Sequence, residues 1–404
     1  MKKLFSLALG LALLLLPSGT GAQIKTLFEE EKVPAFSLPE VLRGTDGRLI
    51  RSKKAWEARR RAEILELFSQ EMYGHVPGRP AGLHFETMAV DTVYDGLGLR
   101  KQVRIYLDEA GKHWFDALLH IPRGMAGPVP FFAGLNFKGN DATLDERSAS
   151  GWPYELILGG GFGVITAWRD SIEPDGKDSP GYTDPRSCCD GGVRAWYNPG
   201  GDWGAISAWA WGLSRLMDYL ETEPAADASR VVVIGHSRLG KTALWAGAND
   251  RRWAGVVSNC SGCCGAAISR RVFGENFESI IHVFPHWFTR EFDKYSGREA
   301  DFPGDQHWLA ALAAPRPLYI VSASKDGWAD PKGEWLCAVE AAPVYKLYRL
   351  PGLVSSRYDA SVWPEPDCPV NEGTIGYHLH EGKHAINAFD WAQYVRFFSR
   401  ELSR

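Results

Sequence analysis

The sequence predicts an α/β fold, with a mostly parallel central sheet flanked by helices in a three-layer sandwich. From residue 129 onward, strand-like apolar runs alternate with helix-like segments, the pattern of parallel strands joined by crossover helices. One transition, VVVIGHSRLGK at 231–241, passes from β-branched residues directly into a helix-forming run. The chain has 404 residues, of which 45% are hydrophobic and 23% charged, a composition typical of globular proteins.

The predicted elements follow in order along the chain. Residues 53–74 carry Ile64, Phe68 and Met72 on one stripe, which predicts an early amphipathic helix. The first two strands after it lack helical spacing and form an antiparallel lead-in. A long polar loop lies at 174–204. We expect strands at 102–107, 114–121, 129–137, 162–168, 231–234, 255–259, 317–322 and 345–350, the last strand, and helices at 203–221 and 389–398.

The turn at Ser237 is the most informative feature of the chain. The strand-like run ends at Gly235, and the helix-forming run begins by Lys241. A serine on such a sharp turn is how an α/β-hydrolase exposes its nucleophile above the sheet. The pattern departs from G-x-S-x-G, because Leu239 occupies the second glycine position and Gly240 follows it. An ordinary turn with a capping serine is the alternative.

The first 22 residues predict a signal peptide. Lys2 and Lys3 precede an apolar run over 4–16, and the small residues at 20–22 provide a cleavage site. The run is short for a membrane span, and no later segment is apolar for long enough. We expect an exported protein, periplasmic or secreted, in which residues 23–404 form a single α/β-hydrolase catalytic domain with an N-terminal extension over about 23–100.

Charge and cysteine usage narrow the possible partners. The formal net charge of −4 indicates no nucleic-acid partner, and we expect neither a membrane partner nor a stable oligomer, so the protein should be a monomer. The sixteen tryptophans either pack in the core or line a sugar-binding surface. The cysteine spacing does not fit a zinc framework, and the odd count leaves one thiol free or paired between chains. We interpret the cysteines as structural: Cys188, Cys189, Cys260, Cys263, Cys264, Cys337 and Cys368.

Two later residues complete a catalytic triad with Ser237. A serine nucleophile needs a histidine base, and the base needs a carboxylate to orient it. In α/β-hydrolases the chain order is serine, acid, histidine. Asp326 follows the strand-like segment PLYIVSAS, and His384 lies just before the last helix. An aspartate after a strand is commonly only a turn former, but the three residues in this order predict a triad.

Six motifs occur together along the chain: RLIRSKKAWEARRRAEILELF at 48–68, NFKGN at 136–140, GHSRLGK at 235–241, SNCSGCCGAA at 258–267, DGWADPKGE at 326–334 and HEGKHAINAFDW at 380–391. With these motifs the chain resembles the glucuronoyl esterases, carbohydrate esterase family 15, particularly the bacterial members. The resemblance runs from about Leu38 to the C-terminus. It implies hydrolysis of the ester between 4-O-methyl-glucuronic acid on glucuronoxylan and lignin alcohols, without a cofactor.

The resemblance implies roles for three residues of the catalytic site. It makes Ser237 the nucleophile, His384 the base and Arg238 part of the oxyanion stabilisation. A guanidinium beside the nucleophile places positive charge where the tetrahedral oxygen becomes negative. If the family resemblance is set aside, the alternative role for Arg238 is a surface salt bridge.

The resemblance also implies a set of sugar-binding residues. Lys241, Glu275 and Trp328 match positions that hold the glucuronoyl ring. Lys241 and Glu275 can exchange hydrogen bonds with hydroxyls, and Trp328 can pack on the ring. If the family resemblance is set aside, each of the three residues has an ordinary structural explanation: a lysine in a first helical turn, a solvated glutamate and a packed tryptophan.

Cys260 departs from the pattern of many family members, which place the triad acid at that position. A cysteine cannot replace a carboxylate there. Other bacterial members carry an acid after the penultimate strand, where this chain has Asp326. We therefore expect Asp326 to be the triad acid, with Asp330 as the fallback.

Three other functional interpretations compete with a glucuronoyl esterase. The segment from His380 to His384 matches H-E-x-x-H, a zinc protease pattern, but Gly376 and Gly382 disfavour the helix it needs, and no third ligand follows. We therefore predict no metal. A non-catalytic carbohydrate-binding protein and an acetyl xylan esterase are the remaining alternatives. Asp326 argues against the first of these, and only the sugar-binding set argues against the second.

Overall fold

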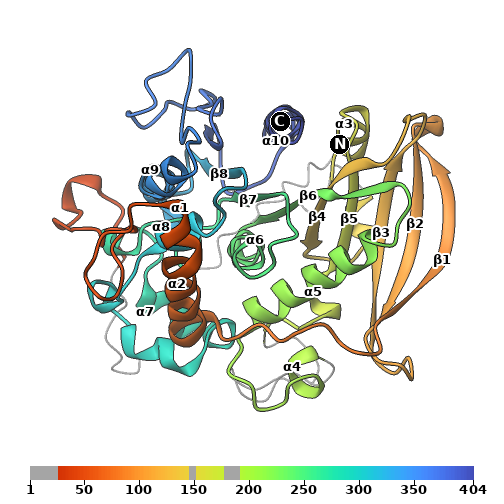
Figure 1. The fold of residues 1–404 in the computed structure, drawn as a ribbon, viewed down its shortest axis with the longest axis horizontal. Coiled ribbons are helices and arrows are strands. Elements are labelled where there is room, and N and C mark those ends of the chain that lie inside the picture. Colours follow the sequence, from red (N-terminus) through yellow and green to blue (C-terminus); the bar gives the residue numbers. More distant parts are fainter. Residues whose placement is uncertain (1–25, 145–151, 177–191) are drawn as a thin grey trace, which may run out of the picture.

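The structure is a computed structural model that describes residues 26–144, 152–176 and 192–404. The predicted signal peptide at 1–22 and the pair Cys188–Cys189 lie outside these residues. The architecture is an α/β-hydrolase fold built on one nine-stranded sheet, in the order β1-β2-β3-β5-β4-β6-β7-β8-β9 (Figure 1). No helix in the described ranges combines the length and apolar character that crossing a membrane requires.

The sheet is parallel from β5 to β9 and antiparallel at its other end, where β1, β2, β3 and β5 pair in turn. The strands are β1 (His84–Val93), β2 (Gly98–Tyr106), β3 (Trp114–Pro122), β4 (Val129–Asn136), β5 (Gly163–Trp168), β6 (Ala226–His236), β7 (Gly255–Asn259), β8 (Leu318–Ala323) and β9 (Ile375–His380).

Helices cover both faces of the sheet. They are α1 (Lys53–Ala55), α2 (Arg61–Phe68), α3 (Tyr154–Gly159), α4 (Val193–Trp196), α5 (Ala205–Leu220), α6 (Arg238–Asn249), α7 (Phe277–Val283), α8 (Gln306–Ala311), α9 (Pro331–Leu347) and α10 (Ala388–Glu401). Figure 1 shows α3 and α10 on one side of the sheet and α5 and α6 on the other. Each face buries its own apolar cluster, so the predicted three-layer arrangement is confirmed.

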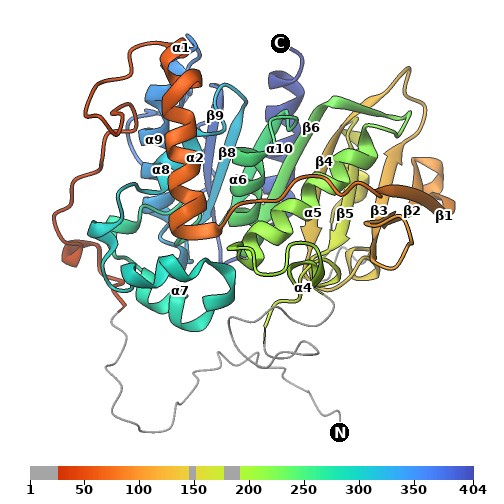
Figure 2. The same ribbon diagram turned by 60° about the horizontal axis from the view of Figure 1, so that its bottom comes forward.

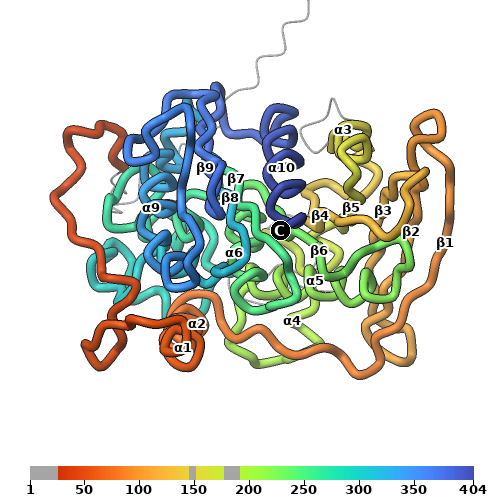
Figure 3. The backbone as a smooth tube through the Cα atoms, turned by 45° about the horizontal axis from the view of Figure 1, so that its top comes forward, coloured from red at the N-terminus to blue at the C-terminus, as the bar shows by residue number. Residues whose placement is uncertain are grey.

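The N-terminal extension crosses the molecule before it enters the sheet. Figure 3 shows it passing from the side of α9 and β9, through α1 and α2, to β1 at the opposite end. The predicted helix at 53–74 is present over Lys53–Tyr73, with wider turns at Trp56–Arg60 and Ser69–Tyr73. Trp56, Ile64, Phe68 and Met72 are buried, as the stripe predicts.

The prediction of a last strand at 345–350 is wrong. This segment is the end of α9 and the turn after it, and Tyr345 is fully buried against the core. Its alternation of apolar and charged residues imitates a strand, and Pro343 suggests a helix boundary, yet α9 continues through that proline. The last strand is β9, in which His378 and His380 are buried. Because two of its buried residues are polar, the segment lacks the apolar run that would have predicted a strand. The edge strand β1 is also absent from the predicted set.

Candidate active site

The candidate site lies at the carboxyl ends of four neighbouring parallel strands. Ser237 follows β6, Cys260 follows β7, Asp326 lies in the loop after β8, and His384 lies in the loop after β9. The strands are paired up to these ends, with His236 opposite Asn259 and Ala323 opposite His380. Parallel strands end at one edge of a sheet, so residues distant in sequence converge here.

The turn at Ser237 has the strained geometry expected for an exposed nucleophile. Ser237 has φ 58° and ψ −129°, a conformation that is costly for any residue but glycine. Its backbone N–H donates to the carbonyl of Asn259 at 2.9 Å, which holds the turn against β7. The strand β6 and the helix α6 therefore meet at the serine, as the motif predicts.

The two glycines of the motif explain its unusual spacing. A Cβ on Gly235 would lie 1.9 Å from the carbonyl oxygen of Leu239, so the turn closes only over glycine. A Cβ on Gly240 would lie 2.9 Å from Ser261 Cβ, in the loop after β7. Leu239 itself is buried in the core. The second close approach thus occurs one residue later than in G-x-S-x-G.

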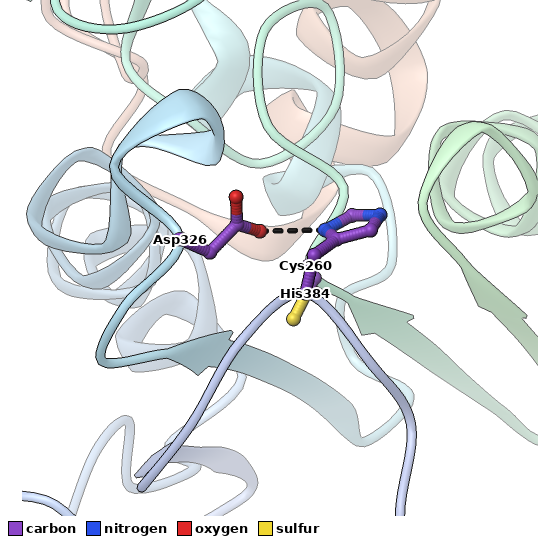
Figure 4. Close-up of side chains that lie close together, drawn as sticks. All are labelled: Cys260, Asp326 and His384. Carbon is purple, nitrogen blue, oxygen red and sulfur yellow. Dashed lines mark hydrogen bonds and ion pairs between the residues drawn. The ribbon is translucent and has the colours of Figure 1, made fainter. Parts of the chain in front are cut away.

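Asp326 and His384 form a hydrogen-bonded pair, with 2.6 Å between Nδ1 of His384 and Oδ2 of Asp326 (Figure 4). The side chain of Asp326 is 6% exposed, whereas that of His384 is 41% exposed. The buried carboxylate of Asp326 thus holds the Nδ1 edge of the His384 ring, while the rest of that ring is open to a ligand. The pairing leaves Nε2 of His384 for a second partner.

Asp330 serves a different purpose. Its carboxylate accepts from Nε of Arg271 at 2.8 Å and from the backbone N–H of Gly333 at 3.0 Å, which caps the start of α9. Asp330 is buried and directed at these donors. Asp326 is therefore the carboxylate that binds His384, whereas Asp330 supports the fold through Arg271 and the start of α9.

Cys260 lies next to this pair. Figure 4 shows its side chain beside the pair, and the ligand atoms of Cys260, Asp326 and His384 lie within 4.8 Å of one another. Burial, together with the negative charges of Glu334 and Asp326, raises the pKa of the Cys260 thiol well above its usual value. A neutral thiol 3.7 Å from the carbonyl of Ala385 cannot stabilise a charged imidazole as a carboxylate does.

His236 connects the nucleophile turn to the base. Its ring centroid lies 4.5 Å from that of His384, and its Nδ1 is 2.6 Å from Oδ1 of Asn259. The amide nitrogen of Asn259 donates to Asp390 and Tyr394, so its oxygen must accept the proton of His236 Nδ1. Burial and the nearby His384 lower the pKa of His236 to about 3, which keeps this ring neutral.

The two histidines of the H-E-x-x-H segment have separate partners. His380 ends β9, and its Nδ1 lies 3.0 Å from Oδ1 of Asp390, while His378 approaches the same oxygen at 2.8 Å. Burial alone would raise the pKa of Asp390, but hydrogen bonds from both histidines hold it well below its usual range. His384 instead faces Asp326, and no helix spans the segment, as its glycines predict.

Arg238 is held firmly beside the nucleophile. Its Nη1 lies 2.7 Å from Oδ2 of Asp175, and its guanidinium lies over the rings of Phe284 and Trp287, with centroids at 5.0 and 4.8 Å. Its Nε is buried and has no hydrogen-bond partner within the described ranges. The side chain thus combines a fixed cation with an unused N–H donor.

The carboxylate of Asp175 is kept ionised by its surroundings. Burial would raise its pKa, but a hydrogen bond from His286, the charges of Arg169 and Arg238, and a bond from Trp287 together hold it well below the usual range. Sequence reasoning missed Asp175, which lies 63 positions before Arg238 in a polar loop. Its only local signal is a single aspartate in IEPDG, which does not reveal a distant partner.

The predicted sugar-binding residues lie together. Lys241 is buried in the first turn of α6, where its Nζ donates to the carbonyl of Ser261 at 2.5 Å and lies 3.8 Å from Oε2 of Glu275. Burial raises the pKa of Glu275, while Lys241 and a hydrogen bond with Trp328 oppose the shift. The backbone N–H of Glu275 donates to the carbonyl of Trp328 at 2.9 Å, and the indole is 45% exposed.

The fold and this arrangement define a carboxylic ester hydrolase of the α/β-hydrolase class. The family model described as "Glucuronyl esterase, fungi" matches residues 181–348. The chain is 40% identical over 413 residues to Carbohydrate esterase MZ0003 from an unknown prokaryotic organism, a match that covers 93% of this chain and 92% of that protein. The protein therefore belongs to carbohydrate esterase family 15, the glucuronoyl esterases, as its motifs predict.

Other relatives agree with this assignment. The solved glucuronoyl esterase from Solibacter usitatus superposes with a TM-score of 0.83 at 40% identity, covering 92% of this chain and 99% of that one. A 4-O-methyl-glucuronoyl methylesterase from Phanerochaete chrysosporium is 28% identical over 342 residues, which are 81% of this chain and 66% of the fungal protein.

Proposed function

We propose that this enzyme hydrolyses the ester between 4-O-methyl-glucuronic acid of glucuronoxylan and lignin alcohols. The 2.6 Å hydrogen bond between Asp326 and a half-exposed His384, next to the strained Ser237 turn, carries the proposal. The names of the fungal relatives, 4-O-methyl-glucuronoyl methylesterases, support the choice of acid.

The reaction proceeds through an acyl-enzyme. Oγ of Ser237 attacks the ester carbonyl carbon while its proton passes to Nε2 of His384. The tetrahedral intermediate collapses, the C–O bond to the alcohol breaks, and His384 returns the proton to the departing alcohol. Water then attacks the acyl-enzyme by the same route and releases the uronic acid. Asp326 accepts from Nδ1–H throughout and stabilises the charged ring.

Arg238 stabilises the negative oxygen that develops in each tetrahedral intermediate. Its guanidinium is already held by Asp175 and stacked on Trp287, so little reorganisation is needed when the charge appears. The Arg238 side chain is 27% exposed, so part of its guanidinium is open to a ligand.

Lys241, Glu275 and Trp328 hold the glucuronoyl ring. The ammonium of Lys241 and the carboxyl group of Glu275 lie 3.8 Å apart, so both can exchange hydrogen bonds with neighbouring hydroxyls of the sugar. The exposed indole offers a flat apolar surface to the ring. We further propose that the protein is exported by its first 22 residues and acts as a monomer.

Ester selectivity tests this function. We expect hydrolysis of benzyl and methyl glucuronate, with lower kcat/KM on the galacturonate ester and little activity on acetylated xylan. Ser237→Ala should abolish turnover and still bind the uronic acid. Preference for acetyl esters would make the protein an acetyl xylan esterase, and binding without turnover by the wild type would make it a carbohydrate-binding homologue.

A further inference from the structure

The first described residues of the chain reach the candidate site. The backbone N–H of Gly274 donates to the carbonyl of Leu27 at 2.7 Å, and Gly274 directly precedes Glu275. Figure 2 shows the start of the described chain beside the α7 region. A segment distant in sequence from the triad is therefore attached to the loop that carries a predicted sugar-binding residue.

Ion pairs fasten this segment. The carboxylate of Glu30 lies 2.7 Å from Nη2 of Arg271 and 2.6 Å from Nζ of Lys332. The Arg271 side chain is only 2% exposed and also pairs with Asp330. Glu30 therefore completes the partners of a buried cation, which fixes the position of the residues just before it.

The segment places an aromatic ring against Trp328. The ring of Phe28 stacks with that indole, with centroids 6.3 Å apart and planes at 30°, and it meets Phe273 edge-on at 6.3 Å. Phe28 is nevertheless 53% exposed, and Trp328 is 45% exposed. A soluble protein gains little stability from two aromatic rings so open to water, and adjacent exposed rings commonly mark a binding surface.

We infer that Trp328 and Phe28 form an aromatic ledge, in which Trp328 packs on the esterified uronate and Phe28 binds the xylan sugar next to it. The inference rests on the proposed function. Trp328 contacts Glu275, which pairs with Lys241, and Phe28 stacks on Trp328. The apolar face of a xylopyranosyl unit carries C–H groups that pack on such a ring. The ledge thus extends recognition from the uronic acid to the polysaccharide that carries it.

Two substrates and one substitution test this inference. Wild type and Phe28→Ala are compared on benzyl glucuronate, which lacks xylose, and on the methyl ester of 4-O-methyl-glucuronoyl xylotriose. We expect the substitution to lower kcat/KM on the oligosaccharide ester about 5- to 10-fold, mainly through KM, the scale expected for uncovering part of one ring face. The value on benzyl glucuronate should stay within about twofold.

Controls separate binding from support of the fold. Phe28→Trp should restore the oligosaccharide value, and Phe36→Ala, which removes another exposed phenylalanine of the same extension, should leave both substrates unchanged. An equal loss on both substrates would overturn the inference, because Phe28 would then only position Trp328. Unchanged kinetics on both would overturn it as well. A wild type that hydrolyses neither ester would instead refute the proposed function, and the inference with it.

Discussion

Replacing Asp326 with asparagine tests the assignment of the acid most directly. Asp326 accepts the Nδ1 proton of His384 at 2.6 Å and is itself buried. An asparagine amide can donate to Nδ1 instead, which moves the proton of the ring to Nε2. His384 could then no longer accept the proton of Ser237. Loss of this orientation lowers kcat about 10⁴-fold in serine hydrolases, which equals about 5.4 kcal/mol of transition-state stabilisation.

Asp330→Asn is the matched control, because it removes a carboxylate four residues further along. The substitution breaks a buried ion pair with Arg271, which costs about 3–5 kcal/mol of folding stability. Asparagine can still cap Gly333. We therefore expect a lower Tm with kcat close to that of the wild type at 25 °C.

The assay is kcat/KM on benzyl glucuronate for both variants, with Tm measured alongside. Asp326→Asn should lose nearly all activity with only a small change in Tm. Comparable activity losses in the two folded variants, or a larger loss from Asp330→Asn, would refute the reasoning.

Further predictions concern the oxyanion, the thiol, pH and metals. Arg238→Gln should lower kcat about 10²–10³-fold with little change in KM, measured by steady-state kinetics, since its charge acts on the developing oxyanion. Cys260→Ala should keep kcat within about threefold, because its thiol makes only a weak contact at 3.7 Å; a loss like that of Asp326→Asn would contradict this. Burial lowers the pKa of His120 to about 3 in the folded protein. Between about pH 6.5 and pH 3 only the unfolded chain therefore binds a proton at this histidine, so the free energy of unfolding falls as the pH drops through this range. His120→Phe should flatten the resulting decline in Tm. Activity should survive a strong chelator, because His380 and His384 face different carboxylates; inhibition that zinc reverses would refute this.

The features that sequence reasoning recovered are the ones with local causes. The strand, Gly235, Ser237 and the helix of the nucleophile turn lie within one short segment, so their chemistry can be read without knowing the fold. The order of Asp326 and His384 along the chain then follows from the topology of a parallel sheet, whose strand ends meet at one edge.

The features it did not recover depend on contacts between distant segments. Asp175 acquires its importance only because the fold brings it to Arg238, and Phe28 only because the extension returns to Trp328. The error at 345–350 has a related cause, since burial against the core overrides the strand-like alternation at the end of α9.

The pairing of β7 with β8 has an evolutionary consequence. The two strands run in the same direction, with Asn259 opposite Val321, and the N–H of Cys260 still donates to Val321 at 2.7 Å. Loops leaving these neighbouring ends bring the side chains of residues 260 and 326 to within 4.8 Å of the His384 ring nitrogen, so a lineage can transfer the acid from one loop to the other through an ancestor that carries both carboxylates. Once the transfer is complete, a small uncharged side chain at the vacated position avoids repulsion with the new acid, and the thiol at 260 meets that requirement.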